Sequence, residues 1–211
     1  MLNNSYGGSS MSQLKLTADG GGGTVAIKAP ASTTGNAAIE LIVPGTASGT
    51  LAVGDTGKIL QVVQTVKTDQ FTSTAYSYTD VSGMSVSITP ASASNKILIN
   101  FELQVGGTAN NYASFRLLRG STHIGVSTVS NSNHRIGTLG SLSHENSYQL
   151  ENTGLTFLDS PNTTSAITYK LQVSCYSNRA MSLNHPTSTG NSSGSYTATG
   201  ISTITAMEVA A

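Results

Sequence analysis

Nine consecutive residues near the middle of the chain, 97–105, restrict the possible fold more than any other stretch. Large apolar side chains occupy every second position there, and the positions between them are mostly polar. The apolar set is Ile97, Ile99, Phe101, Leu103 and Val105, and it alternates with Leu98, Asn100, Glu102 and Gln104. A period of two predicts a β-strand with one face in a core and one wetter face.

The same alternation recurs on both sides of this strand. Upstream, one predicted strand carries Leu60, Val62, Gln64 and Val66 on one side, and another carries Met84, Val86 and Ile88 before Pro90. Downstream, the pattern predicts strands at 113–119, 123–129, 154–161, 167–177 and 200–211. About eight strands joined by turns, with no segment of helical period, predict an all-β fold, an antiparallel β-sandwich of jelly-roll type.

Composition supports strands over helices. Ser, Thr and Asn supply 74 of the 211 residues, and their side chains compete for the backbone hydrogen bonds that a helix needs. Charged residues make up only 9%, against about 25% in typical soluble domains. Such a weakly charged chain repels copies of itself little, which favours assembly.

Charge and hydropathy exclude several classes of function. Ten basic and ten acidic residues are spread along the chain, so there is no basic stripe for nucleic acid. No apolar run approaches the roughly 20 residues that span a bilayer, which predicts no membrane insertion. The first residues, MLNNSYGGSSMSQ, lack the charged start and apolar core of a signal peptide.

Residues 1–57 differ in character from residues 58–211, where the apolar alternation becomes dense. Around a run of four glycines, the pattern predicts a β-hairpin, and a third short strand is predicted at 37–43. The candidate anchoring residues of these strands are Leu14, Leu16, Val25, Ile27, Ile39 and Leu41. Because so few large side chains cannot close a core, we expect an extended arm that adds strands to a neighbouring protein. A disordered tail is the alternative.

Two long polar segments, 130–147 and 178–195, are predicted loops of the globular domain. Loops longer than about 12–15 residues are usually functional or disordered, so these two form the candidate distal contact surface. Its candidate residues are His134, His144, Tyr148 and His185. His134 and His144 share one loop with Glu145, so a metal or pH-sensitive contact is the alternative to solvated histidines.

No residue pattern selects a catalytic site. The single cysteine, Cys175, has the strand parity of Leu171 and Val173, which predicts a small buried side chain. The glycine run at 20–23 lacks the lysine and hydroxyl of a phosphate loop. We therefore predict no catalytic residue, no bound metal, no cofactor and no enzymatic activity.

Several segments together resemble a domain of virion structural proteins of tailed bacteriophages, particularly phages of cyanobacteria and other aquatic bacteria. The segments are GKILQVVQTVKTDQFTSTAYSYTDVSGMSVSITPASASNKILI, FRLLRGST, LTFLDSP, YKLQV and STITAMEV, with the lead-ins ADGGGGTVAIKAPAST and VPGTASGTLAVGDTGKILQ. In that family the domain forms the carboxy-terminal knob of fibre-like proteins. The likeness extends from about residue 14 to the end and lies in framework strands.

The resemblance implies a homotrimeric sandwich on the virion surface, made in the host cytoplasm, with no catalytic or cofactor residues to carry over. Because no long shaft precedes the knob, we expect a capsid decoration or cement protein whose arm binds the major capsid protein or another virion protein. A receptor-binding tail fibre, whose loops contact a host surface glycan or protein, is the alternative. A polysaccharide-degrading tail enzyme is a more distant one.

Overall fold

The computed structural model describes residues 13–17, 24–28, 57–129, 135–176, 178–188 and 197–211. The chain divides into two compact units, residues 1–51 and 52–211. In the first, β1 (Gln13–Thr17) pairs antiparallel with β2 (Thr24–Lys28), with Leu14 opposite Ile27 and Leu16 opposite Val25. The two strands of the predicted hairpin are therefore confirmed. The strand predicted at 37–43, with Ile39 and Leu41, lies outside the described residues.

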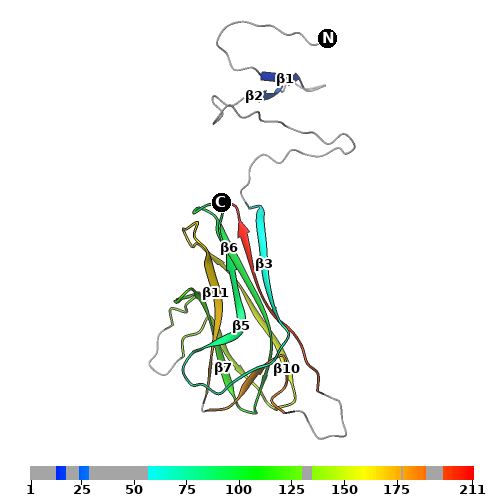
Figure 1. Ribbon diagram of the computed structural model, residues 1–211, viewed down its shortest axis with the longest axis vertical. Helices are drawn as coiled ribbons and strands as arrows, with labels where there is room; N and C mark the ends of the chain where they lie inside the picture. Colours follow the sequence, from blue (N-terminus) through cyan, green and yellow to red (C-terminus); the bar gives the residue numbers. More distant parts are fainter. Residues whose placement is uncertain (1–12, 18–23, 29–56, 130–134, 177, 189–196) are drawn as a thin grey trace. The chain divides into compact units, whose positions relative to one another are not determined.

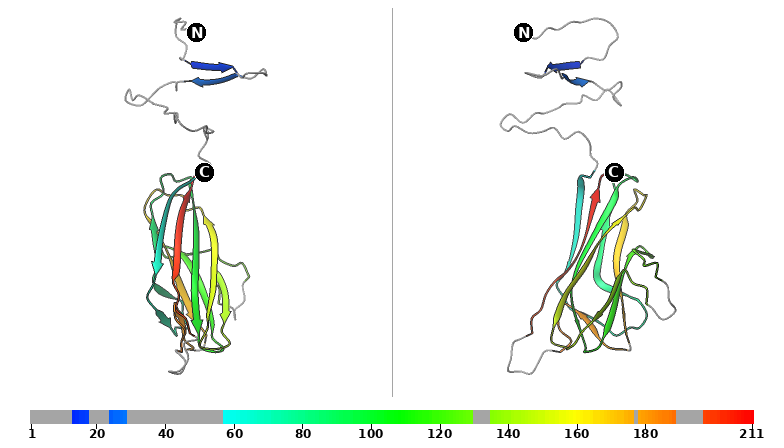
Figure 2. Two further views of the ribbon diagram at one scale, coloured as in Figure 1. Left: turned by 90° about the vertical axis from the view of Figure 1, so that its right-hand side faces the viewer. Right: turned by 180° about the vertical axis from the view of Figure 1, so that it is seen from behind.

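The second unit is built from β-strands, and none of its described residues is helical, which confirms the all-β prediction (Figure 1). Its strands are β3 (Ile59–Lys67), β4 (Phe71–Ser73), β5 (Thr79–Ile88), β6 (Lys96–Gly107), β7 (Tyr112–Arg119), β8 (Thr122–Ile124), β9 (Leu139–Ser143), β10 (Leu150–Asp159), β11 (Ile167–Cys175), β12 (Met181–Leu183) and β13 (Ser202–Val209). The long strands run along the length of the unit and curl around a common interior (Figure 2).

These strands form two antiparallel sheets. The first has the order β3-β13-β6-β12-β4, with β10 on the other edge of β6, and the second has the order β5-β11-β7-β8, with β9 also on β7. The pairing is nested: β3 pairs with β13, β5 with β11, and β6 with β10. Strands far apart in sequence are therefore neighbours.

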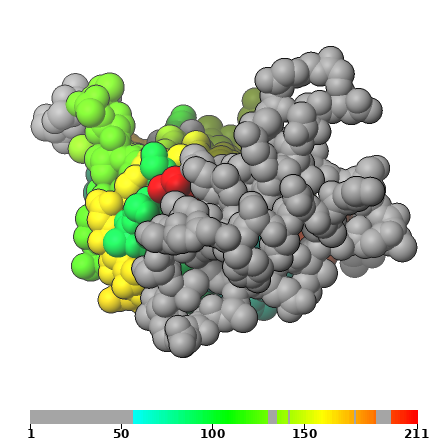
Figure 3. Space-filling model, turned by 90° about the horizontal axis from the view of Figure 1, so that it is seen from above, coloured from blue at the N-terminus to red at the C-terminus, as the bar shows by residue number. Residues whose placement is uncertain are grey.

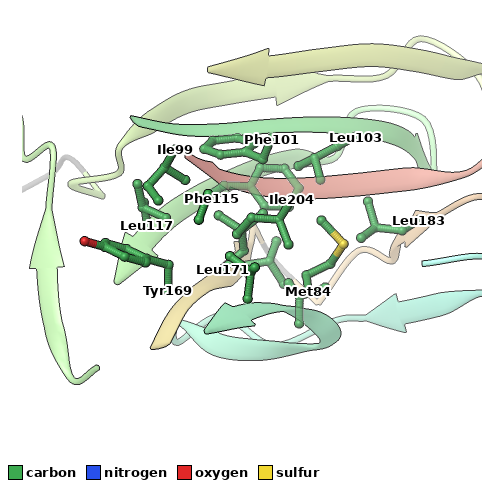
Figure 4. Close-up of a cluster of buried hydrophobic side chains, with 14 of the residues drawn as sticks. Met84, Ile99, Phe101, Leu103, Phe115, Leu117, Tyr169, Leu171, Leu183 and Ile204 are labelled. Carbon is green, nitrogen blue, oxygen red and sulfur yellow. The ribbon is translucent and has the colours of Figure 1, made fainter. Parts of the chain in front are cut away.

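The core lies between the inner faces of the two sheets (Figure 4). The predicted inner face of β6 is confirmed, because Ile97, Ile99, Phe101, Leu103 and Val105 are all fully buried. The second sheet contributes a matching set of buried side chains. These are Val81, Met84, Val86 and Ile88 of β5, Ala113, Phe115 and Leu117 of β7, and Tyr169, Leu171, Val173 and Cys175 of β11. The alternation in the sequence thus predicted most of the core.

The structure corrects the sequence reading of the two long loops. The segment 130–147 contains β9, and the segment 178–195 contains β12, whose three residues are all buried. The pattern also missed β4 and placed seven residues, 123–129, in the strand that becomes the three-residue β8. Short strands of this kind form because a long neighbour supplies their hydrogen bonds, and three residues show no measurable period.

The apolar side of β3 is turned away from the core. Leu60, Val62 and Val66 are exposed, whereas Gln61, Val63 and Thr65 are partly buried and Lys67 is buried. In β13, by contrast, the inward positions are Ser202, Ile204, Ala206 and Glu208.

Glu208 and its donors join three segments at the end of the sandwich where β3 begins. The Glu208 carboxylate accepts hydrogen bonds from Gln61 Nε2, Ala91 N and Asn95 Nδ2. Burial raises the pKa of Glu208, but these hydrogen bonds outweigh burial and hold the pKa below its usual value. Figure 3 views this end, where the red C-terminal residues lie beside green residues of the β5–β6 connection.

A buried carboxylate also joins three strands of opposite sheets. Asp159, at the end of β10, accepts a 2.7 Å hydrogen bond from the Tyr169 hydroxyl of β11. Both Asp159 oxygens lie 3.0 Å from Arg119 Nη1 of β7. Burial, together with this carboxylate, raises the pKa of Tyr169 well above its usual range, so the phenol remains the donor.

Replacing Asp159 tests this network. We expect Asp159→Asn to lower the free energy of unfolding by about 3 kcal/mol, because it leaves the Arg119 charge without its partner in a mostly buried site. Asp80→Asn is the matched control. It removes a carboxylate that is 53% exposed, against 8% for Asp159, in a 2.7 Å pair with Lys170, and pairs open to solvent contribute less than about 1 kcal/mol. Urea unfolding measures both, and equal losses in the two variants would contradict the assignment.

Candidate contact surface at the distal end

The sandwich has two different ends. At the proximal end β3 begins, and Gly57 N donates to Ala210 O over 2.8 Å. At the opposite, distal end β6 and β11 finish and β7 and β10 begin, as the register places Gly106 of β6 opposite Leu150 and Ala113 of β7 opposite Cys175. The candidate contact residues belong to the connections at this distal end.

Two segments more than 30 residues apart in sequence meet there. Strand β12 pairs with the last residues of β6, with Met181 opposite Gly107 and Leu183 opposite Val105. Ser188 N then donates to Ser147 O over 3.0 Å. The structure therefore brings the described parts of the two predicted loops together around residues 144–148 and 184–188. His134 lies outside the described residues.

His144 does not belong to the exposed surface. Its side chain is 1% exposed, and neither ring nitrogen has a hydrogen-bond partner among the described residues. The imidazole packs against the backbone of Gly107 so closely that a Cβ at position 107 would lie 2.3 Å from His144 Cδ2. The glycine is thus required by the packing of the histidine.

The electrostatics of His144 favour its neutral form. Burial lowers its pKa, and the carboxylate of Glu151, 3.5 Å from Nδ1, only partly opposes that shift. His185 is different, because it is partly exposed and its Nδ1 lies 2.6 Å from Pro186 O. Tyr148 is the most exposed of the candidate residues that the structure describes.

Three further tyrosines, Tyr76, Tyr112 and Tyr176, extend the exposed surface at this end. The rings of Tyr112 and Tyr176 meet edge to face with their centroids 5.9 Å apart, because β7 and β11 are neighbours. Arg135 fixes this arrangement, since its guanidinium donates to Ser174 O over 2.9 Å and to Tyr112 O over 2.6 Å. Nearby, Ser174 Oγ donates to Tyr76 O.

The sequence indicates Tyr76 and Tyr112 only as tyrosines in turn-like segments, and it gives no sign of Tyr176, the ring partner of Tyr112. The pairing of β7 with β11 decides that contact. Exposed aromatic side chains offer rigid apolar area with a polar hydroxyl, which suits stacking on a sugar ring or anchoring a protein partner.

Among the described residues, no three His, Cys, Asp or Glu side chains are grouped so as to hold a metal ion. No helix formed by them is long and apolar enough to cross a membrane.

No family model matches the chain, and no curated protein matches it. Among solved structures, the chain is similar to three structures from infectious bursal disease virus, each 14% identical over 81% of this chain. They are a mutant VP2 protein in derived T=1 particles (TM-score 0.39), the Gx strain (0.38) and the VP2 subviral particle (0.34).

The chain covers only 41%, 43% and 46% of those three chains, respectively, which is less than half the length of each.

The buried His144 predicts a loss of stability in mild acid. Below the usual histidine pKa of about 6.5, the unfolded chain takes up a proton at this position that the folded chain takes up only at lower pH. The stabilisation is therefore fully present above that pH and is lost as the pH falls. Chemical unfolding at about pH 7.5 and pH 5.5 measures the loss, which should be smaller in His144→Gln. A variant that loses as much as the wild type would contradict the prediction.

Proposed function

We propose that the protein is a structural component of a bacteriophage virion, a homotrimeric capsid decoration or cement protein. Residues 58–211 form the projecting knob, and residues 1–57 form the arm that binds the major capsid protein or another virion protein. The protein acts by binding alone, with no catalytic residue, metal or cofactor. The sequence resemblance to phage knob domains motivates the proposal.

The observation that carries this proposal is that the two ends of the sandwich differ. The chain enters the knob at Gly57, at the proximal end, while the exposed tyrosines lie at the distal end. An anchored projection needs this separation, because the end that joins the arm faces the shell and the other end faces outward.

The nested strand pairing supports a jelly-roll sandwich, the finer part of this proposal. The pairs β3–β13, β5–β11 and β6–β10, with β7 beside β8 and β9, give the two four-strand-wide layers of that fold. Jelly rolls occur in viral capsid proteins, lectins and cupins, so the fold is compatible with a virion role without selecting it.

The mechanism of stabilisation is mass action. A protein that binds only the assembled shell stabilises that shell by its binding free energy. In the arm, β1 and β2 form a hairpin that carries Leu14, Leu16, Val25 and Ile27, and we propose that they add strands to a shell protein together with Ile39 and Leu41. Three arms joined by one trimer raise the avidity of weak contacts.

Deleting residues 1–44 tests the arm. We expect the truncated protein to lose attachment to particles and to keep the folded knob, because the core lies wholly in residues 58–211. Deleting residues 1–12 is the control, since it leaves β1 and β2 in place. Co-sedimentation with particles that lack the protein measures attachment. Saturation of particles by the 1–44 deletion would contradict the anchoring role.

A receptor-binding tail fibre is the second candidate, and the distal tyrosines favour it. In this case the surface of Tyr112, Tyr148 and Tyr176 would contact a host glycan or protein. We expect Tyr176→Ala to reduce adsorption to the host about five- to thirtyfold while particle stability stays unchanged, because stacking on one aromatic ring contributes on the order of 1–2 kcal/mol. Val126→Ala, exposed on a different part of the knob, is the control. Equal adsorption of both variants would count against the fibre.

A further inference from the structure

The two faces of strand β3 have the reverse of the chemical character expected in a sandwich: its outward face is apolar and its inward face is mostly polar. Its outward side chains include Leu60, Val62 and Val66, which are 45%, 57% and 46% exposed. Between residues 61 and 67 its inward positions hold Gln61, Thr65 and Lys67, with Val63 the one apolar residue among them. An antiparallel sheet with one solvated face normally presents polar side chains to water.

The inward polar groups fix this orientation. Thr65 Oγ1 donates to Ser85 O of β5 over 2.7 Å, and Gln61 Nε2 donates to Thr89 O over 2.7 Å. Lys67 Nζ, itself buried, lies 2.8 Å from Asp69 Oδ1. Because a shift of one residue would break the bonds that Thr65 and Gln61 make to other segments and reverse every side chain, the outward apolar side chains are a determined feature of the fold.

The apolar side chains continue across the sheet as a row. The register places Val62 opposite Met207 of β13, Met207 opposite Leu98 of β6, and Leu98 opposite Leu158 of β10. Leu158 is 47% exposed. We call this face, formed by the outward side chains of β3, β13, β6 and β10, the apolar face.

The neighbouring row is polar but uncharged. Gln64 Nε2 donates to Thr205 Oγ1 over 2.8 Å, and Asn100 Nδ2 donates to Thr156 Oγ1 over 2.9 Å. These side chains bond to one another across the strands, so part of their hydrogen-bonding capacity is already satisfied within the sheet. Covering them therefore removes fewer hydrogen bonds to water.

Charge is nearly missing from the apolar face. Along the outward positions of its four strands the charged side chains are Lys96 and Glu102, six residues apart on β6. Depletion of charge around a buried apolar centre is the compositional mark of an interface core, and contiguous exposed apolar patches mark interaction sites.

We propose that the apolar face is where copies of this chain pack against one another with their strands parallel. This inference rests on the proposed trimer and names the surface that builds it. When the strands of neighbouring copies run parallel, each row faces the same row of the next copy. The apolar row Val62–Met207–Leu98–Leu158 then meets its counterpart, and so does the neighbouring row of amide and hydroxyl side chains. These two rows are thus complementary to themselves, and the exposed Glu102, two rows beyond Leu98 on β6, lies outside them. A parallel arrangement also directs every arm from the same end of the assembly.

Substitution of Val62 in the full-length protein tests the interface. A trimer of Val62→Asp would bury three carboxylates without partners, which is strongly unfavourable. We expect the wild type to sediment as a trimer and Val62→Asp to be a folded monomer with unchanged circular dichroism, its association weakened at least thirtyfold. Val126→Asp, an exposed valine outside the apolar face, is the matched control and should remain a trimer. Leu158→Lys, in the same row on β10, should behave as Val62→Asp does and covers the case in which Val62→Asp does not fold.

The outcomes separate this inference from the proposed function. Trimers of both Val62→Asp and Leu158→Lys as stable as the wild type would overturn the interface while leaving the trimeric decoration protein intact. A wild type that is monomeric at micromolar concentration would overturn the trimer and with it this interface. A monomeric wild type whose particle binding is lost in Val62→Asp would show that the apolar face binds the shell instead, which also overturns the inference.

Discussion

Burial of one face of β6 is the constraint on which the rest of the knob depends. Its five inward apolar side chains are fully buried, and burying each is worth roughly 1.5–3 kcal/mol. The strand reaches that state only because β10 covers one edge while β13 and β12 share the other. Since those partners come from the last third of the chain, most of the domain must be in place before this strand is complete.

Polar groups then decide how the sheets are tied together. At the proximal end, Glu208 gathers donors from β3 and from the β5–β6 connection. Farther along the sandwich, Asn184 Nδ2 donates to Lys67 O and Asp69 O, each over 2.9 Å, and its Oδ1 accepts from Ser202. Asn184 has a φ of 68°, a left-handed conformation that asparagine tolerates better than most residues. Buried amides and carboxylates with all these partners specify one arrangement of the strands.

The same fold leaves two surfaces of different chemistry. The distal end carries exposed tyrosines held by the β7–β11 pairing and by Arg135, and it offers aromatic area to a partner. The apolar face carries aliphatic rows with almost no charge, and its side chains suit burial against a copy of themselves. The proposed arm, contact surface and interface thus belong to separate parts of the molecule.

The sequence by itself determined the all-β class, the hairpin strands at 13–17 and 24–28, and the core faces of β5, β6 and β11, because a period of two is a local property of the chain. It also placed Cys175 correctly as a small buried strand residue. Tertiary structure alone decided what depends on pairing between distant segments. It turned Leu60, Val62 and Val66 outward, because Gln61 and Thr65 find hydrogen-bond partners inside. It buried His144 against Gly107 where the sequence predicted an exposed loop, and it joined Tyr112 to Tyr176. Alternation shows that a strand has two faces, but only its neighbours determine which face meets water.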